Sequence, residues 1–257
     1  MTVTESRFVA VEVEDVDVAQ ADRYERAIET LIRSMREANL GSEFQWNASQ
    51  HDFSYYYSFP LTSLQDLDPD TGVIQQRFRR LSASIDPDAA DAFSMVTARA
   101  VQATRLFILE RVAEFTHEAP NSVVEAAKHA FLDIHYVRTG QAEPYKKATR
   151  RLMAAARKSD YPLGWSAYRM VIGEGATFYG EGKVYCYVVP FDSPSQFYEQ
   201  HSFQGAMVQE LGEESARELL MDERRCLVKL ETSEHRLRPE LSYTPEPAQS
   251  EIGVKRS

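Results

Sequence analysis

The chain lacks the features that would place it in a membrane or on a nucleic acid. No apolar run among its 257 residues approaches the roughly 20 residues that a transmembrane helix needs. The formal net charge is −10, and the arginine pairs are isolated rather than gathered in a basic stripe, so phosphate groups would be repelled. The first residues lead straight into a strand-like pattern without a charged-then-apolar signal segment. We therefore expect a cytoplasmic protein with no nucleic-acid or membrane partner.

Several motifs with well-defined chemistry are also missing. The sequence contains no Gly-x-Gly-x-x-Gly, no Walker loop, no Gly-x-Ser-x-Gly and no His-Glu-x-x-His, and its six histidines are scattered. The two cysteines, Cys186 and Cys226, lie in separate apolar runs and form no Cys-x-x-Cys pair. This pattern predicts two buried free thiols and no metal site.

What the chain does contain is a repeat. At a shift of 121 positions, residues 20–24 (QADRY) fall on residues 141–145 (QAEPY). At a shift of 130, residues 55–63 (YYYSFPLTS) fall on residues 185–193 (YCYVVPFDS), with the Pro-x-x-Ser corner in both. Near the end of each copy we return to a shift of 121 positions, so that residues 106–107 align with 227–228. A similar order over such lengths predicts an internal tandem duplication.

Hydrophobic periodicity gives each copy the same order of elements, β-α-β-β-α-β. Valines alternate with polar residues in the first strand, and apolar residues recur at three- to four-residue spacing in the first helix. The glycine-rich stretch 173–182 predicts a hairpin loop. The predicted strands are 9–14, 43–50, 53–59, 106–115, 130–135, 164–172, 183–189 and 226–232. The predicted helices are 19–38, 72–84, 88–103, 141–158, 194–204 and 213–223.

This order is that of the ferredoxin-like unit, so the fold class is α+β. Helices cover one face of such a sheet, and in a duplicated chain the sister sheet is the natural cover for the other. Over residues 7–235 the sequence thus resembles the dimeric α/β-barrel superfamily in its single-chain form. We expect one ferredoxin-like repeat in residues 1–118, a second in 119–238, and a disordered tail in 239–257.

Polar residues on the first strand of each copy are the first candidate site. We expect the valine face of that strand to meet the helices, so that Glu12 and Glu14 in copy one face the space between the sheets. Asp133 and His135 align with them in copy two. In a partly closed cavity Asp133 and His135 could serve as catalytic acid or base. The alternative is that these strands line an open, wetted barrel end.

Aromatic residues on the inner strands are the second candidate feature. An apolar cavity edged by tyrosine hydroxyls is typical of small-molecule sites, although aromatic residues also favour strands simply as core. The predicted ligand-binding aromatics are Trp46, Tyr55, Tyr57, Trp165, Tyr168, Tyr185 and Tyr187.

Histidines supply two further resemblances. The segment from Ser193 to His201, a serine-rich corner followed by Phe197, resembles antibiotic-biosynthesis-type monooxygenases of the superfamily, which implies that His201 helps to close the cavity. A surface histidine is the alternative. The superfamily also includes chlorite dismutases, which ligate haem through a histidine, and that resemblance leaves His129, His135 and His201 as axial candidates.

Three functions remain open from the sequence. The first is an enzyme, an oxygenase or isomerase that needs no cofactor and acts on a small organic molecule held between the sheets. The second is a non-catalytic binder that uses the same cavity. The third is a structural protein whose barrel is filled by side chains. No cofactor is expected, haem is kept as an alternative, and a homo-oligomer is left open.

Overall fold

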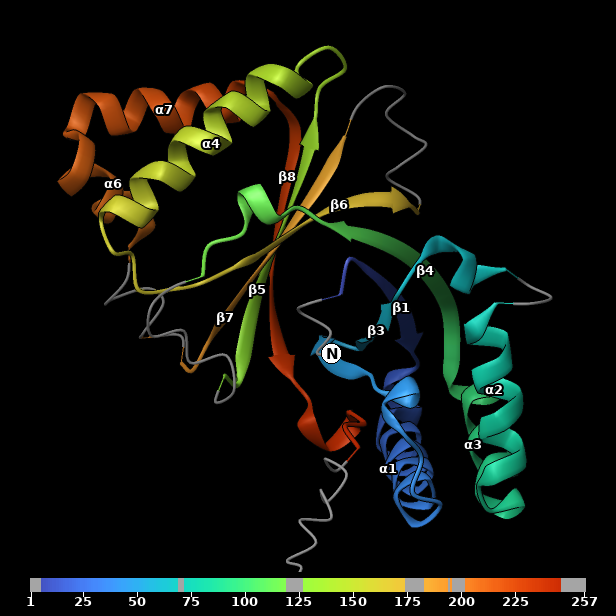
Figure 1. Cartoon of the computed structure of the whole chain (residues 1–257). Helices are drawn as coiled ribbons and strands as arrows, with labels where there is room; N and C mark the ends of the chain where they lie inside the picture. Colours follow the sequence, from blue (N-terminus) through green and yellow to red (C-terminus); the bar gives the residue numbers. More distant parts are fainter. Residues whose placement is uncertain are drawn as a thin grey trace, which may run out of the picture.

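The computed structural model describes residues 6–68, 72–118, 127–173, 183–193, 195 and 202–245. Its strands close into one antiparallel barrel in the order β1-β3-β2-β8-β5-β7-β6-β4, with helices outside it in two separate groups (Figure 1). The strands are β1 (Phe8–Val16), β2 (Asn47–His51), β3 (Ser54–Leu61), β4 (Val101–Arg111), β5 (His129–Val137), β6 (Ser166–Ile172), β7 (Val184–Phe191) and β8 (Leu227–Leu237).

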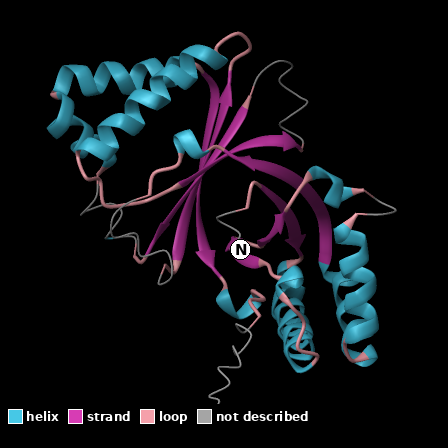
Figure 2. Cartoon of the chain, viewed as in Figure 1, coloured by secondary structure: helices cyan, strands magenta, loops and turns pink. Residues whose placement is uncertain are grey.

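The helices cover the outside of the barrel (Figure 2). They are α1 (Ala21–Glu37), α2 (Val73–Ser84), α3 (Pro87–Ala100), α4 (Ala142–Lys158), α6 (Phe203–Leu211) and α7 (Glu213–Arg225). Helix α1 buries Tyr24, Ile28, Leu31 and Met35, which recur at three- to four-residue spacing and form one apolar stripe. None of the described helices combines the length and apolarity that crossing a membrane requires.

The chain has the same order of elements before and after β5. The first half runs β1-α1-β2-β3-α2-α3-β4, and in the second half, as far as it is described, β5-α4-β6-β7-α6-α7-β8 follows. The halves join at two seams of the barrel, where β4 pairs with β6 and β2 pairs with β8. The α+β class and the barrel are therefore confirmed. The tandem duplication would explain the common order, and it stays a prediction.

The two faces of the first strands are opposite to our prediction. Val9 of β1 packs in one cluster with Leu109, Tyr168 and Cys186, which come from β4, β6 and β7. Val11, Phe107, Leu132, Ile134, Met170 and Val188 pack against the same cluster, which thus takes side chains from five strands of the closed barrel, so the valine face points inward. Glu14, on the other face, bonds to a tyrosine of α1. An eight-stranded barrel has an interior that side chains fill, and the most apolar faces therefore turn inward.

The alignment of the fourth strands was also wrong. In the barrel, β1 pairs Val16 with Val101 of β4, and β5 pairs Val137 with Leu227 of β8. Val101 and Leu227 are thus equivalent, at a shift of 126 rather than 121. The error arose because residues 101–103 continue the helical pattern of α3, whereas the strand already begins at Val101.

Short straps after β4 and β8 tie the halves together. The first strap contains the turn Ala113–Phe115 and the second contains Pro239–Leu241. Leu241 is fully buried, so the predicted disordered tail does not begin at 239. Residues 246–257 of that tail, and most of the predicted helix 194–204, lie outside the described residues.

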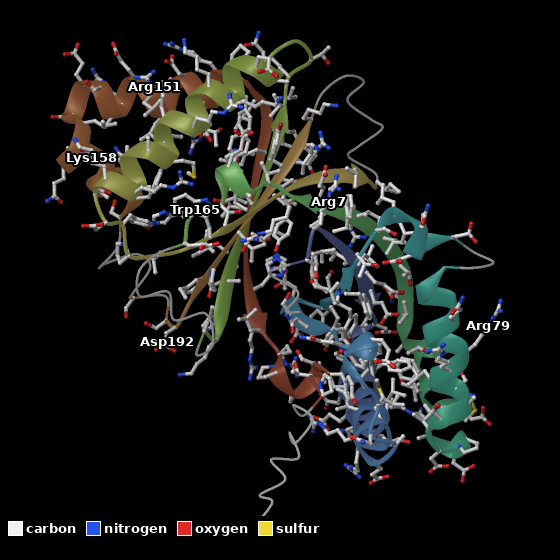
Figure 3. The ribbon with its side chains drawn as sticks, viewed as in Figure 1. Arg7, Arg79, Arg151, Lys158, Trp165 and Asp192 are labelled. Atoms are coloured by element: carbon white, nitrogen blue, oxygen red, sulfur yellow. The ribbon has the colours of Figure 1, made fainter. Side chains whose placement is uncertain are left out.

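Charged side chains gather on the outer surfaces of the helices (Figure 3). The side chains of Arg151 and Lys158 on α4 are 57% and 76% exposed, whereas Trp165 beneath that helix is buried. The outer helix faces therefore carry solvated charge, and the polar groups of functional interest must be sought beneath the helices.

Candidate functional site

Five polar side chains meet between the sheet and the helices of the second half. Asp133 and His135 are two positions apart on β5, so both point to the helix-covered face. Tyr187 of β7 lies directly opposite Asp133. Tyr145 comes from the first turns of α4, and Glu223 from the last turn of α7. We call these five residues the His135 cluster.

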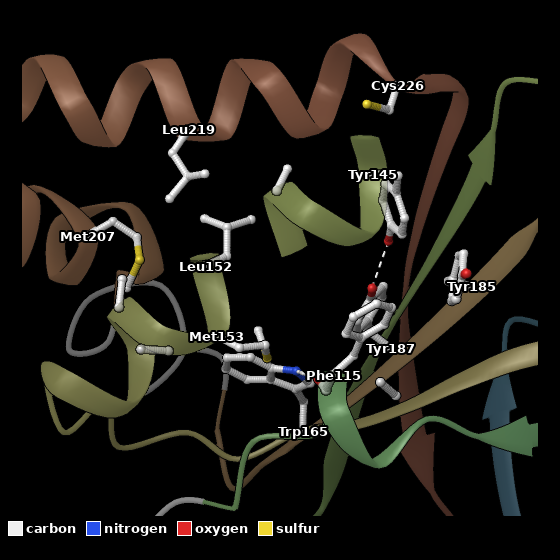
Figure 4. Packing of buried hydrophobic residues seen from close by; sticks show 14 of the residues in the cluster. Phe115, Tyr145, Leu152, Met153, Trp165, Tyr185, Tyr187, Met207, Leu219 and Cys226 are labelled. Atoms are coloured by element: carbon white, nitrogen blue, oxygen red, sulfur yellow. Dashed lines mark hydrogen bonds between the residues drawn. The ribbon is translucent and has the colours of Figure 1, made fainter. Parts of the chain in front are cut away.

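The Nδ1 atom of His135 is held from two sides. It lies 3.0 Å from Tyr145 Oη and 3.5 Å from Glu223 Oε1. Tyr145 Oη lies in turn 2.7 Å from Tyr187 Oη (Figure 4). The imidazole ring also packs on Tyr187, with the ring centroids 4.8 Å apart. Within the described part of the chain, the other ring nitrogen, Nε2, makes no hydrogen bond, so the ring is oriented by its packing and by the polar contacts of Nδ1.

Burial sets the protonation of this pair. It lowers the pKa of His135 to about 4, and the nearby Arg224 guanidinium acts in the same direction, so the imidazole is neutral at pH 7. Burial raises the pKa of Glu223 to about 7, with Asp133 adding to the rise and Arg224 opposing it. The contact between His135 and Glu223 is therefore not an ion pair, because it joins a neutral imidazole to a carboxyl group that is half-ionised near neutrality.

Two buried oxygen atoms close to these groups make no hydrogen bond of good geometry. They are Oδ1 of Asp133 and Oγ1 of Thr149, which is one turn along α4 from Tyr145 and lies near the hydroxyls of Tyr145 and Tyr187. Burial also raises the pKa of Asp133, although Thr232 and Arg224 oppose the rise. An unpaired buried polar atom costs about 1–3 kcal/mol, so such atoms in a native fold call for an explanation. A ligand contact is one such explanation.

The first half carries a related arrangement with different chemistry. Tyr24 of α1 hydrogen-bonds Glu14 of β1 and lies 2.8 Å from the hydroxyl of Tyr57 on β3. Tyr24, Glu14 and Tyr57 thus occupy the places of Tyr145, His135 and Tyr187. Burial, with Glu14 nearby, raises the pKa of Glu12 to about 7. Glu12 and Glu14 of β1 both carry carboxyl groups, so of these two arrangements only the one in the second half has an imidazole.

Of the other predicted site residues, Tyr187 belongs to the His135 cluster, and Tyr185 lies beside it, opposite His135 and stacked on Tyr145 with the ring centroids 5.0 Å apart. The indole Nε1 atoms of Trp46 and Trp165 donate to the strap carbonyls of Leu241 and Phe115, at 2.8 Å in both cases. These two tryptophans therefore fasten the straps. Tyr55 and Tyr185 also pack beneath the helices, and Tyr168 lies inside the barrel.

The predicted placement of Glu12, Glu14, Asp133 and His135 between the sheets was wrong, since all four lie on the helix-covered face. On that side the hydroxyls of Tyr24 and Tyr145 meet Glu14 and His135, while apolar side chains fill the barrel. His201 lies outside the described residues.

Sequence reasoning missed Glu223, Tyr145 and Thr149. Tyr145 had a usable signal, because it aligns with Tyr24 in the repeat. Glu223 had none, because it stands in a highly charged helix, where a glutamate is normally solvated. Its burial arises only because the last turn of α7 lies over β5.

The His135 cluster offers proton-transfer and hydrogen-bonding chemistry. No group of three or more His, Cys, Asp or Glu residues suited to a metal ion occurs among the described residues. A neutral imidazole with one free nitrogen can accept or donate a hydrogen bond, and a carboxyl group half-ionised near neutrality can take or give a proton. Tyr145 and Tyr187, which contact His135, belong to the apolar core beneath α4, α6 and α7 (Figure 4).

Comparison with known proteins identifies the fold. No protein-family model and no curated protein matches the chain. Among solved structures, a proposed monooxygenase from Lactobacillus acidophilus NCFM is 11% identical, with TM-score 0.50 over 94% of this chain and 97% of that one. An anthrone oxidase-like protein is 11% identical, with TM-score 0.51 over 91% and 93%.

A mutant chlorite dismutase from Candidatus Nitrospira defluvii, in complex with cyanide, is 10% identical, with TM-score 0.50 over 92% of this chain and 93% of that one. At such identities the likeness concerns the fold alone. The chain therefore shares the α+β barrel fold of these three proteins.

Proposed function

We propose that the protein binds a small organic molecule in the second half, between the sheet and helices α4 and α7, with His135 Nε2 as the polar contact. The observation that carries this proposal is the unequal use of the two ring nitrogens. Nδ1 is anchored by Tyr145 and Glu223, and Nε2 has no partner in the described part of the chain. An imidazole with one anchored and one free nitrogen is pre-oriented for a ligand.

The surroundings of the His135 cluster support a ligand of mixed character. Apolar side chains of the helix-covered core, to which Tyr145 and Tyr187 belong, would supply most of the contact area, as in typical small-molecule sites. Asp133 Oδ1 and Thr149 Oγ1 supply buried polar atoms that make no hydrogen bond of good geometry. A ligand that reaches these atoms would complete their hydrogen bonding.

The more specific proposal is an enzyme that works by acid-base chemistry, an oxygenase or an isomerase. His135 would remove a proton from the bound molecule through Nε2, and Asp133 and Tyr145 would orient the reacting groups. The pKa of His135 itself is about 4, and the group in contact with it whose pKa lies near neutrality, where proton transfer is most effective, is Glu223.

A thermal-shift screen tests binding. The probes are small neutral organic molecules with hydroxyl or N–H groups, and the proteins are the wild type, His135→Ala and the control His51→Ala. His51 is a histidine of β2 whose side chain is 41% exposed. We expect a subset of compounds to stabilise the wild type and the control but not His135→Ala. If no compound stabilises the wild type, or all stabilise His135→Ala equally, the proposal is wrong.

Product analysis then separates an enzyme from a binder. Compounds that stabilise the wild type are incubated with it in air-saturated buffer and followed by mass spectrometry. Conversion that His135→Ala abolishes supports the enzyme. Stabilisation without conversion supports the non-catalytic binder.

Haem is a second candidate, favoured by one observation. An axial imidazole binds iron through one nitrogen while the other meets a carboxylate or carbonyl, and Nε2 and Nδ1 of His135 fit these two roles, with Glu223 as the carboxylate. His135 would then hold the haem, which would supply redox and oxygen chemistry. Titration with haemin tests this idea. A shifted Soret band that His135→Ala removes would support haem, and an unshifted band would exclude it.

A further inference from the structure

We infer that Glu223 is the proton store of the proposed site, and that His135 passes protons between it and the ligand by exchanging one neutral tautomer for the other. This inference rests on the proposed function, since it assumes that Nε2 meets the ligand. Glu223 itself does not touch the ligand in this arrangement and acts through His135, so it is a positioning residue.

Nδ1 of His135 is the shared atom on which the exchange depends. Glu223 Oε1 lies 3.5 Å from it and Tyr145 Oη lies 3.0 Å from it. The Tyr145 hydroxyl can change between donating to Nδ1 and accepting from it, because the hydroxyl of Tyr187 lies 2.7 Å away and can either donate to Tyr145 or accept from it. Every partner of Nδ1 can therefore follow the proton when it leaves or returns.

The charges around the ring favour this exchange over formation of an imidazolium ion. Helix α7 contributes Glu223 and Arg224, β5 contributes Asp133, and α4 and β7 contribute the hydroxyls of Tyr145 and Tyr187. Burial and the Arg224 guanidinium lower the pKa of His135 to about 4, so the ring stays neutral. The pKa of Glu223, raised by burial to about 7, allows this carboxyl group to hold the proton instead.

The two states differ by the position of protons alone. With Glu223 ionised, the ring proton lies on Nδ1, and the lone pair of Nε2 faces the ligand. A ligand O–H or N–H group then gives its proton to Nε2, the Nδ1–H bond breaks, and an O–H bond forms on Glu223. The ligand keeps the electron pair and becomes an anion. The site therefore takes a weak acid that enters in its neutral form.

The tautomer of His135 can be measured without a ligand. Long-range ¹H–¹⁵N spectra of protein labelled with ¹⁵N-histidine distinguish the nitrogen that carries the proton. Between pH 5 and pH 9 we expect the proton to move from Nε2 to Nδ1 as Glu223 ionises. In Glu223→Gln the tautomer should stay the same throughout, whereas the control Glu218→Gln, an exposed glutamate of the same helix, should behave as the wild type.

A wild-type tautomer that does not change with pH, or a change that survives in Glu223→Gln, would overturn the inference. Unaltered signals of the buried His117 and His235 show that each variant is folded. Failure of the proposed function is recognised separately. If the tautomer changes with pH but no compound binds in the thermal-shift screen, the proposed ligand site is refuted. If compounds bind but the tautomer does not change, only the role of Glu223 is refuted.

Discussion

Replacing Glu223 with glutamine should stabilise the protein more at high pH than at low pH. Folding buries the Glu223 carboxyl under α7, where its side chain is 13% exposed and its pKa rises from 4.5 to about 7. A carboxyl whose pKa is raised in the folded state binds its proton more tightly there than in the unfolded chain. Its ionisation therefore destabilises the fold, increasingly so as the pH rises from 4.5 towards 7.

The magnitude follows from the two pKa values. At pH 8 the buried carboxylate lowers the free energy of unfolding by about 3 kcal/mol, and at pH 5 by about 1 kcal/mol. Glutamine has a similar shape and no charge, so its other effects on stability do not change with pH. The difference in the free energy of unfolding between Glu223→Gln and the wild type should thus grow by about 2 kcal/mol from pH 5 to pH 8.

Urea denaturation followed by circular dichroism at the two pH values measures this difference. Glu218→Gln is the matched control, because it removes an exposed glutamate from the middle of the same helix. Its difference from the wild type should not change with pH. A difference for Glu223→Gln that is equally independent of pH would refute the burial argument.

Three further predictions concern the framework around the site. Tyr145→Phe removes the hydroxyl that holds His135, and should lower the free energy of unfolding by about 1–2 kcal/mol in urea denaturation. Arg238→Ala removes the two hydrogen bonds of 2.7 and 2.8 Å that the guanidinium donates to Glu25, leaves that carboxylate with the bond from Tyr55, and should cost about 3 kcal/mol in the same assay. Leu241→Ala opens a cavity beneath the fully buried strap residue and should also cost about 3 kcal/mol. Losses under about 0.5 kcal/mol would contradict each assignment.

The sequence predicted the order of the elements well, because that order depends on local periodicity. The apolar stripe of α1 placed the helix at 19–38, and the structure has it at Ala21–Glu37. The face of β1 could not be predicted from the same kind of signal. Alternation distinguishes an apolar from a polar face, but in a barrel wrapped by helices both faces are covered. Whether a given face points into the barrel or packs under the helices is decided by how the barrel closes.

For the candidate site too, local alternation along a strand was informative, and contacts between elements distant in sequence were not. Alternation placed Asp133 and His135 on one face of their strand, and in the structure they share that face beside Tyr187. Their main partner, Glu223, is far away in sequence, and its burial depends on how α7 lies over β5. No local pattern in a charged helix reports such a contact.

The location of the ligand is the central claim, and NMR chemical-shift mapping tests it most directly. Mixtures of small neutral organic compounds are added to protein labelled at histidine Cε1 and isoleucine methyl groups. The account predicts that the signal of His135 shifts. The signal of Ile134, which packs against Val9, Leu109, Tyr168 and Cys186 inside the barrel, should not shift. Shifts of Ile134 with an unmoved His135 would contradict it, and would return the site to the space between the sheets.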